Sequence, residues 1–126
     1  MSYMTDYKRA RGLGSAHEGT HHFWIQRVTA VALIPLGLLF IWPFAAALGE
    51  GAEAAQAIYR NGWNAFIAIN FFVLTFWHLK LGVQVVIEDY VHGKGRRLRF
   101  LLANMYFCWG MGLAAVMAVV KIWLGA

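Results

Sequence analysis

The stretch Gly62-Trp-Asn-Ala-Phe-Ile-Ala-Ile-Asn-Phe-Phe-Val-Leu-Thr-Phe-Trp-His78-Leu79 decides the fold of this chain. It carries no Asp, Glu, Lys or Arg, and it reaches the length of about 18 residues at which an apolar segment can cross about 30 Å of hydrocarbon as an α-helix. Similar stretches run from Val28 to Leu48 and from Phe100 to Val120. The sequence therefore predicts an all-α membrane protein with three transmembrane helices.

Composition agrees with a membrane protein. Of 126 residues, 60% are hydrophobic and only 13% are charged, against about 25% charged in a typical soluble domain. A polar segment precedes the first span, so that span is not expected to be a cleavable signal peptide. The single cysteine, Cys108, can form neither an intrachain disulfide nor a cysteine-ligated cluster alone.

The positions of the charges explain the net charge of +5. Basic residues gather before the first span and between the second and third, whereas the first connection pairs Arg60 with Glu50 and Glu53. By the positive-inside rule the N-terminal tail faces the cytoplasm and the C-terminus lies across the membrane. This distribution sets topology and does not form a nucleic-acid patch. The basic residues are Lys8, Arg9, Arg11, Arg27, Lys94, Arg96, Arg97 and Arg99.

The chain divides into a polar tail and a membrane domain. Residues 1–22 are rich in glycine and too poor in apolar residues to fold alone, so they are expected to order against a partner. Residues 23–126 form the anchor domain, with helices expected at about 23–48, 62–90 and 99–124. Pro35 should bend the first helix, a short surface helix is expected within 49–61, and Gly93 and Gly95 should break the chain.

One face of the second helix carries two unusual groups. His78 lies inside the apolar run, and Asp89 follows 11 residues later, which at about 100° per residue returns to the same face after three turns. An ionisable group inside a membrane is costly and usually faces a cofactor, a partner or water. His78 is therefore either a hydrogen-bonded packing residue or a ligand to haem or another metal.

Several neighbours favour haem. Gly82, one turn beyond His78, leaves room for a flat macrocycle, and Phe71, Phe72, Phe76 and Trp77 offer aromatic walls. Bis-histidine ligation of a b-type haem needs a second imidazole. Because the other histidines, His17, His21, His22 and His92, are expected outside the bilayer, that second ligand would come from another chain.

Asp89 and Tyr90 end the second helix, where carboxylates are disfavoured by the helix dipole. Either Lys94 and Arg96 neutralise the carboxylates of Glu88 and Asp89, or Tyr90 donates a hydrogen bond to a quinone carbonyl while Asp89 orients a basic group or relays protons. Four further residues have open roles. Lys80 either pairs with a haem propionate or Glu88 or is interfacial; Arg27 is a topology anchor or a ligand to propionate or quinone; Trp24 and Ser15 could join the same pocket.

The residues also resemble a known family. The segment His78-Leu-Lys-Leu-Gly-Val-Gln-Val-Val-Ile-Glu-Asp-Tyr-Val-His92 is similar to the signature of the haem-binding membrane-anchor subunit (the D subunit) of succinate dehydrogenase, respiratory complex II. Gly12-Leu-Gly-Ser-Ala16, His22-Phe-Trp24 and Gln26-Arg27-x-Thr29-Ala30 resemble bacterial members. The likeness covers nearly the whole chain.

The resemblance implies a role within a larger enzyme. His78 would be one axial ligand of a haem b shared with the larger cytochrome b anchor subunit, and Tyr90 and Asp89 would belong to a ubiquinone site. A helix bundle shared by both anchors would hold the iron-sulfur subunit and the flavoprotein subunit at the membrane. Succinate oxidation would belong to those partners, since this chain has no flavin-binding glycine motif and no cysteine set for a cluster.

The alternatives to a haem-binding anchor are a small transporter and a purely structural anchor. A small transporter would need a carboxylate within a span as its coupling site, and no span interior contains one. A purely structural anchor could bind quinone without haem, and an optical spectrum of the complex distinguishes it.

Overall fold

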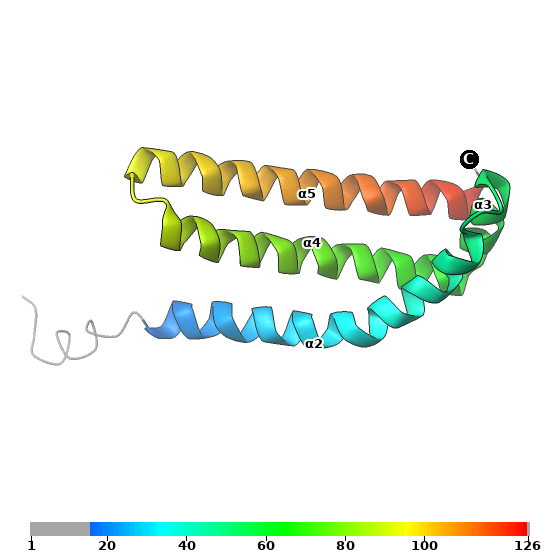
Figure 1. The fold of residues 1–126 in the computed structure, drawn as a ribbon, viewed down its shortest axis with the longest axis horizontal. Coiled ribbons are helices and arrows are strands. Elements are labelled where there is room, and N and C mark those ends of the chain that lie inside the picture. Colours follow the sequence, from blue (N-terminus) through cyan, green and yellow to red (C-terminus); the bar gives the residue numbers. More distant parts are fainter. Residues whose placement is uncertain (1–15, 126) are drawn as a thin grey trace, which may run out of the picture.

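The structure, a computed structural model, describes residues 16–125, with side chains from Gly19 onward. These residues form helices α2 (Ala16–Ala47), α3 (Ala52–Arg60), α4 (Gly62–Tyr90) and α5 (Lys94–Leu124), and no strand occurs among them. Helices α2, α4 and α5 are each long and apolar enough to cross a membrane. The prediction of an all-α membrane protein with three spans is confirmed. Figure 1 shows the three long helices lying along the long axis of the molecule and alternating in direction, with α3 at one end.

The second and third spans meet at a tight connection. Helix α4 has the predicted bounds, Gly62 to Tyr90, but α5 begins at Lys94 rather than near Arg99. The break falls at 91–93, and Gly95 lies inside the first turn of α5. Lysine and arginine are good helix formers, so the basic segment extends the helix despite one glycine. The basic side chains at 94, 96, 97 and 99 are all exposed.

Helix α2 begins earlier than the sequence indicated. It starts at Ala16 instead of Phe23, so His21 and His22 lie on the helix rather than in a tail. Once a helix is nucleated, each added residue costs little, and 16–22 contains no proline. Both Pro35 and Pro43 lie within α2, and α2 changes direction in its C-terminal half (Figure 1), as a missing amide and a ring clash require.

The expected short helix is α3, and it helps to form the core. Asn61 separates α3 from α4 and caps α4, because its Oδ1 accepts hydrogen bonds from the amides of Trp63 (2.9 Å) and Asn64 (3.4 Å). Tyr59 is buried there, and burial raises the pKa of its hydroxyl. The core cluster combines α3, α4 and α5: Tyr59, Ala65, Ala68 and Val119, with Phe40 of α2 packed against it.

This core is small for the size of the chain. The buried hydrophobic residues among those described are Tyr59, Ala65, Ile67, Ala68, Leu81, Cys108 and Val119. Large apolar side chains along every span are exposed, such as Trp42 at 83% and Leu124 at 68%. Since exposed apolar surface on this scale needs lipid or protein to cover it, the chain is built to be embedded in both.

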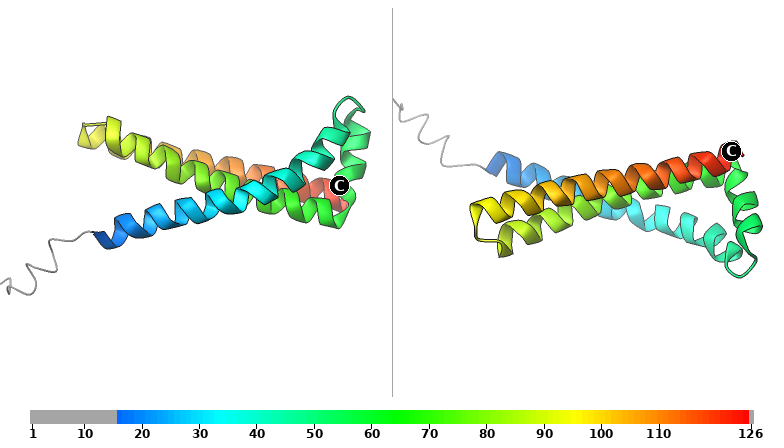
Figure 2. Two further views of the ribbon diagram at one scale, coloured as in Figure 1. Left: turned by 60° about the horizontal axis from the view of Figure 1, so that its bottom comes forward. Right: turned by 90° about the horizontal axis from the view of Figure 1, so that it is seen from above.

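Helices α2 and α4 cross. Figure 2 shows the Ala16 end of α2 lying away from the Tyr90 end of α4, whereas the two helices come together nearer their middles. Phe40 of α2 stacks on Phe71 of α4, with ring centroids 4.4 Å apart and planes inclined by 9°. Gly37 lies beside the Phe71 ring, where an added Cβ would make an ordinary van der Waals contact at 3.7 Å. The crossing positions the site described next.

Candidate functional site between α2 and α4

His78 faces α2 and is held by one side chain of that helix. Its Nδ1 lies 3.0 Å from Oγ1 of Thr29. Thr29 is 6% exposed and is the buried polar residue of the described chain. Its Oγ1 also lies 2.9 Å from the carbonyl oxygen of Ile25 and 3.1 Å from that of Gln26, the common backbone partners of a helical threonine.

These distances fit the imidazole tautomer that is protonated at Nδ1. A threonine hydroxyl has one proton, and the distances from Thr29 Oγ1 to the backbone carbonyls fit its donation to them. The oxygen then accepts a hydrogen bond from Nδ1–H of His78, which leaves the lone pair of the imidazole on Nε2. No described residue is hydrogen-bonded to Nε2. A histidine that binds metal through one nitrogen generally donates the other N–H to an oxygen, and His78 has this arrangement.

A pocket of about 250 Å³ adjoins the imidazole. It is lined by Phe23, Gln26, Arg27, Ala30 and His78. Gly82 lies next to it, since a Cβ at that position would be 3.5 Å from Nε2 of Gln26. Gly82 thus faces α2, and the side-chain amide of Gln26 lies against it where room for a macrocycle was expected.

The aromatic residues expected around His78 have other positions. Phe71 and Phe72 pack with Phe40, at centroid distances of 4.4 and 5.4 Å, and Phe76 packs on α5, where a Cβ at Gly112 would lie 3.3 Å from it. Trp77 lines a different pocket. Phe71 lies two helical turns before His78, which is about 10 Å along the helix axis. Its ring therefore contacts Phe40 in the C-terminal half of α2. Phe23 is the aromatic side chain that lines the His78 pocket.

Asp89 and Tyr90 lie at the open end of the crossing. Because α4 is unbroken from Gly62 to Tyr90, Asp89 lies three turns from His78 on the same helix face. Tyr90 is 76% exposed, and its carbonyl oxygen is 3.1 Å from Nδ1 of His92. The structure brings neither side chain into contact with the His78 pocket.

The neutralisation expected at this end involves different partners. Glu88, rather than Asp89, forms the ion pair, with its Oε1 3.8 Å from Arg97 and 3.0 Å from Nε2 of Gln84. Within residues 19–125, Asp89 has no ion pair with Lys94, Arg96 or any other residue. The sharp connection at 91–93 sets this register, which the sequence does not reveal.

Of the remaining predicted site residues, Arg27 alone reaches the His78 pocket. Its guanidinium lies 5.1 Å from the centroid of the Phe23 ring, a cation–π contact. Trp24 is 64% exposed on another side of α2. Ser15 lies outside the described residues. Lys80, two residues after His78, lines a pocket between α4 and α5 instead, because two residues turn an α-helix by about 200°.

The donor set fits one type of prosthetic group. The described residues contain no group of three or more His, Cys, Asp or Glu side chains that could hold a metal ion. A single imidazole held through Nδ1 can supply, through Nε2, one axial ligand to a haem whose other ligand comes from elsewhere.

Thr29 is the residue that sequence reasoning missed. It appeared only within the motif Gln26-Arg27-x-Thr29-Ala30 and was given no role. The available signal was a hydroxyl near the start of an apolar run, where a polar side chain needs a partner.

A multi-pass helical chain with so small a core and so much exposed apolar surface belongs, as a class, with the subunits of membrane complexes. Comparison with protein families agrees: the model for the succinate dehydrogenase/fumarate reductase transmembrane subunit matches residues 1–120. The chain belongs to this family, and it is therefore part of an enzyme complex.

Curated relatives extend this result. The chain is 39% identical to the succinate dehydrogenase hydrophobic membrane anchor subunit of Paracoccus denitrificans over 126 residues, which is 100% of this chain and 97% of the relative. It is 31% identical to the succinate dehydrogenase membrane anchor subunit of Reclinomonas americana over 83 residues, 64% of this chain and 69% of the relative. A relative from Rickettsia bellii is 27% identical over 105 residues, 83% of this chain and 84% of the relative. No solved structure matches.

Proposed function

We propose that this chain is the anchor subunit of a succinate:quinone oxidoreductase (EC 1.3.5.1) and supplies one axial ligand, His78, to a b-type haem. The second ligand would come from the larger cytochrome b anchor subunit. The complex would work in the tricarboxylic acid cycle and aerobic electron transfer, with succinate oxidised by the flavoprotein and iron-sulfur subunits.

The hydrogen bond between Thr29 and His78 carries the proposal. With Nδ1–H of His78 donating to the Thr29 oxygen, this contact would orient the ring and leave the Nε2 lone pair available for coordination. A haem bound there would supply a one-electron carrier within the membrane. The chain's own contribution is to orient the imidazole before any ligand binds, so that little conformational entropy remains to be lost.

Arg27 fits the role of a propionate ligand. Arg27 lines the same pocket as His78. A guanidinium binds carboxylates through paired, charge-assisted hydrogen bonds. Its contact with the Phe23 ring positions it at the pocket's edge.

Tyr90 and Asp89 are proposed to belong to the ubiquinone site. Both are exposed at the end of α4, so a hydroxyl donor and a carboxylate are available to a ligand that a partner subunit would enclose. Tyr90 would donate a hydrogen bond to a quinone carbonyl, and Asp89 would orient a basic group or relay protons. An isoprenoid tail could remain in lipid beside the exposed apolar surface of the helices.

The distribution of the basic residues supports one orientation of the chain in the membrane. The exposed side chains of Lys94, Arg96, Arg97 and Arg99 gather at the connection between α4 and α5, the same end as the start of α2 (Figure 1). By the positive-inside rule this end faces the cytoplasm of an inner membrane, and the C-terminus the periplasm. The soluble subunits would dock at this end, next to Tyr90.

The haem assignment is tested on the complex purified with its partner subunits. In His78→Leu the reduced b-type α-band and the pyridine haemochrome signal are expected to disappear. The matched control is His92→Leu, which removes an exposed imidazole outside the helices and should leave both signals at the wild-type level. An intact α-band in His78→Leu would remove the ligand assignment.

A further inference from the structure

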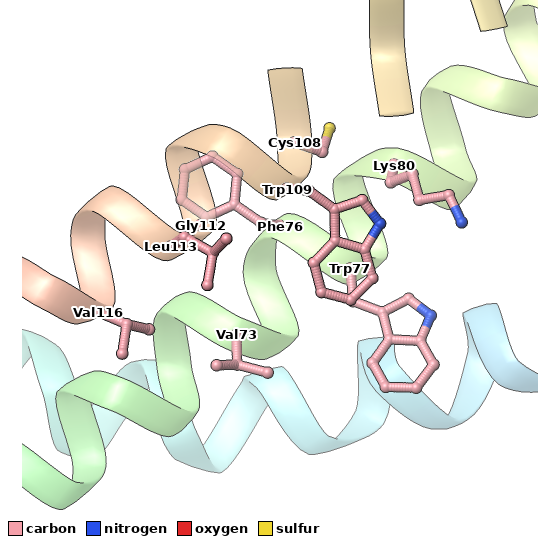
Figure 3. A pocket seen from close by; sticks show the side chains of 9 residues that line it. All are labelled: Val73, Phe76, Trp77, Lys80, Cys108, Trp109, Gly112, Leu113 and Val116. Atoms are coloured by element: carbon pink, nitrogen blue, oxygen red, sulfur yellow. The ribbon is translucent and has the colours of Figure 1, made fainter. Parts of the chain in front are cut away.

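A second pocket lies on the opposite side of α4, against α5. Val73, Phe76 and Trp77 of α4 and Trp109 and Val116 of α5 are among the residues that line it, and Lys80 completes one end. Figure 3 shows this arrangement: Val73 and Val116 lie at one end and Lys80 at the other. The pocket is an apolar trough with a cation at its rim.

The nitrogen atoms of the side chains that line this pocket are all donors. The ammonium of Lys80 and the indole N–H groups of Trp77 and Trp109 can donate hydrogen bonds but cannot accept them. In Figure 3 all three nitrogens lie toward the Lys80 end, away from Val73 and Val116. Within residues 19–125 no carboxylate pairs with Lys80, and no acceptor is hydrogen-bonded to either indole. The ligand that complements this rim is an anion with several acceptor oxygens.

Lys80 lies at the depth of lipid phosphates. Trp63 and Trp123, 64% and 48% exposed, mark the interface at the α3 end, because tryptophan favours the headgroup region. About 30 Å of hydrocarbon corresponds to about 20 helical residues, so the other boundary falls near Val83. Lys80 is within one turn of it, and its four methylenes allow the ammonium to reach the headgroups.

We propose that this pocket binds an anionic phospholipid of the leaflet at the α4–α5 connection. The phosphate binds the Lys80 ammonium and the two indole N–H groups, and one acyl chain follows the trough past Phe76 toward Val116. Charge complementarity selects an anionic headgroup, because the ammonium of Lys80 attracts an anion and repels a cation. The site is separate from the His78 pocket and does not depend on haem or quinone.

The test uses the purified complex in phosphatidylcholine nanodiscs with a minor fraction of phosphatidylglycerol that carries a photoreactive diazirine in its acyl chain. After illumination, cross-linked peptides containing Val73 or Val116 are quantified. Lys80→Gln is expected to lower the cross-linked fraction about fivefold at subsaturating probe, which corresponds to about 1 kcal/mol for one lysine at an anionic surface. Lys80→Arg keeps the charge and should cross-link as the wild type does.

Lys121→Gln provides the matched control, because Lys121 lies near the other end of α5 and its loss should not change the cross-linking. Trp109→Phe keeps the ring but removes one donor, so an intermediate reduction is expected; it also carries the test if Lys80→Gln prevents assembly. Equal cross-linking in Lys80→Gln and wild type, or equal labelling by diazirine phosphatidylcholine, overturns the proposal. Carbodiimide coupling of Lys80 to a carboxylate of a partner subunit overturns it too, because a protein would then occupy the rim.

Discussion

The two sides of α4 treat an ionisable side chain in different ways. On the side that faces α2, His78 finds a partner within the chain, the Thr29 hydroxyl, and one ring nitrogen is left over. On the side that faces α5, the backbone carbonyl of Lys80 accepts a hydrogen bond from Asn104 at 2.9 Å, but its ammonium has no described partner. The α2 side holds the His78 imidazole in one orientation. The α5 side leaves the flexible Lys80 ammonium available to lipid or to another protein. A polar group in a membrane span is thus either oriented by its own chain or reserved for another molecule.

The strongest test of the α2 side is Thr29→Val, a substitution of similar size that removes the hydroxyl. Without an acceptor for Nδ1–H, haem affinity in the assembled complex is expected to fall by about 10- to 100-fold, the usual effect of losing the partner of a metal-bound histidine. Haem content after competition with apomyoglobin measures this. Thr29→Ser retains the oxygen and should retain the haem; equal loss in both variants would mean that the methyl packing, not the hydrogen bond, matters.

A smaller effect is expected at the end of α4, where Tyr90 is exposed. Tyr90→Phe removes one neutral hydrogen bond of about 0.5–1.5 kcal/mol, so the rate of quinone reduction should fall up to about tenfold. Reduction of an artificial dye by the soluble subunits should not change. Tyr106→Phe, which alters an exposed tyrosine on α5, serves as the control. If Tyr90→Phe leaves quinone reduction unchanged, the hydroxyl has no role in the quinone site.

The least effect is expected for the contact that joins α5 to α4. Asn104→Leu removes the hydrogen bond to the carbonyl oxygen of Lys80, and interhelical hydrogen bonds in membrane proteins average about 0.6 kcal/mol. Thermal unfolding of the complex in detergent should therefore shift down slightly. Asn70→Leu removes a hydrogen bond of 2.8 Å that stays within α4, and it should change the unfolding temperature less. A larger shift in Asn70→Leu would show that the interhelical bond does not hold α5 in place.

Local sequence patterns predicted the helices well, but the contacts between helices could not be predicted from the sequence. The bounds of α4 and the presence of α3 follow from apolar length, Asn61 and the turn residues around them, all of which are near in sequence. The 11-residue spacing of His78 and Asp89 also needs only helix periodicity. Thr29 could not be assigned as the partner of His78, because 49 residues separate them and the crossing of α2 over α4 depends on where α2 bends.

The errors have the same origin. Helices α2 and α5 both begin earlier than predicted. The glycines and charges before each apolar run do not end the helix, because extending an existing helix costs little. Glu88 pairs with Arg97 because the connection at 91–93 is short and turns sharply, so the choice among neighbouring carboxylates depends on geometry that composition does not contain. The prediction that aromatic residues surround His78 is wrong for Phe71 and Phe72, because residues on one helix can contact different parts of the neighbouring helix.

The small core has a consequence for how cells must make this subunit. A copy inserted without its companions would have only this small core to hold its helices together, and the apolar surface along every span would be open to other chains. Such an orphan would be a substrate for membrane proteases and prone to clumping with other unassembled chains. Its production therefore has to be matched in time and amount to that of its companions, so that translation stoichiometry, rather than the intrinsic stability of the chain, sets how much of it persists.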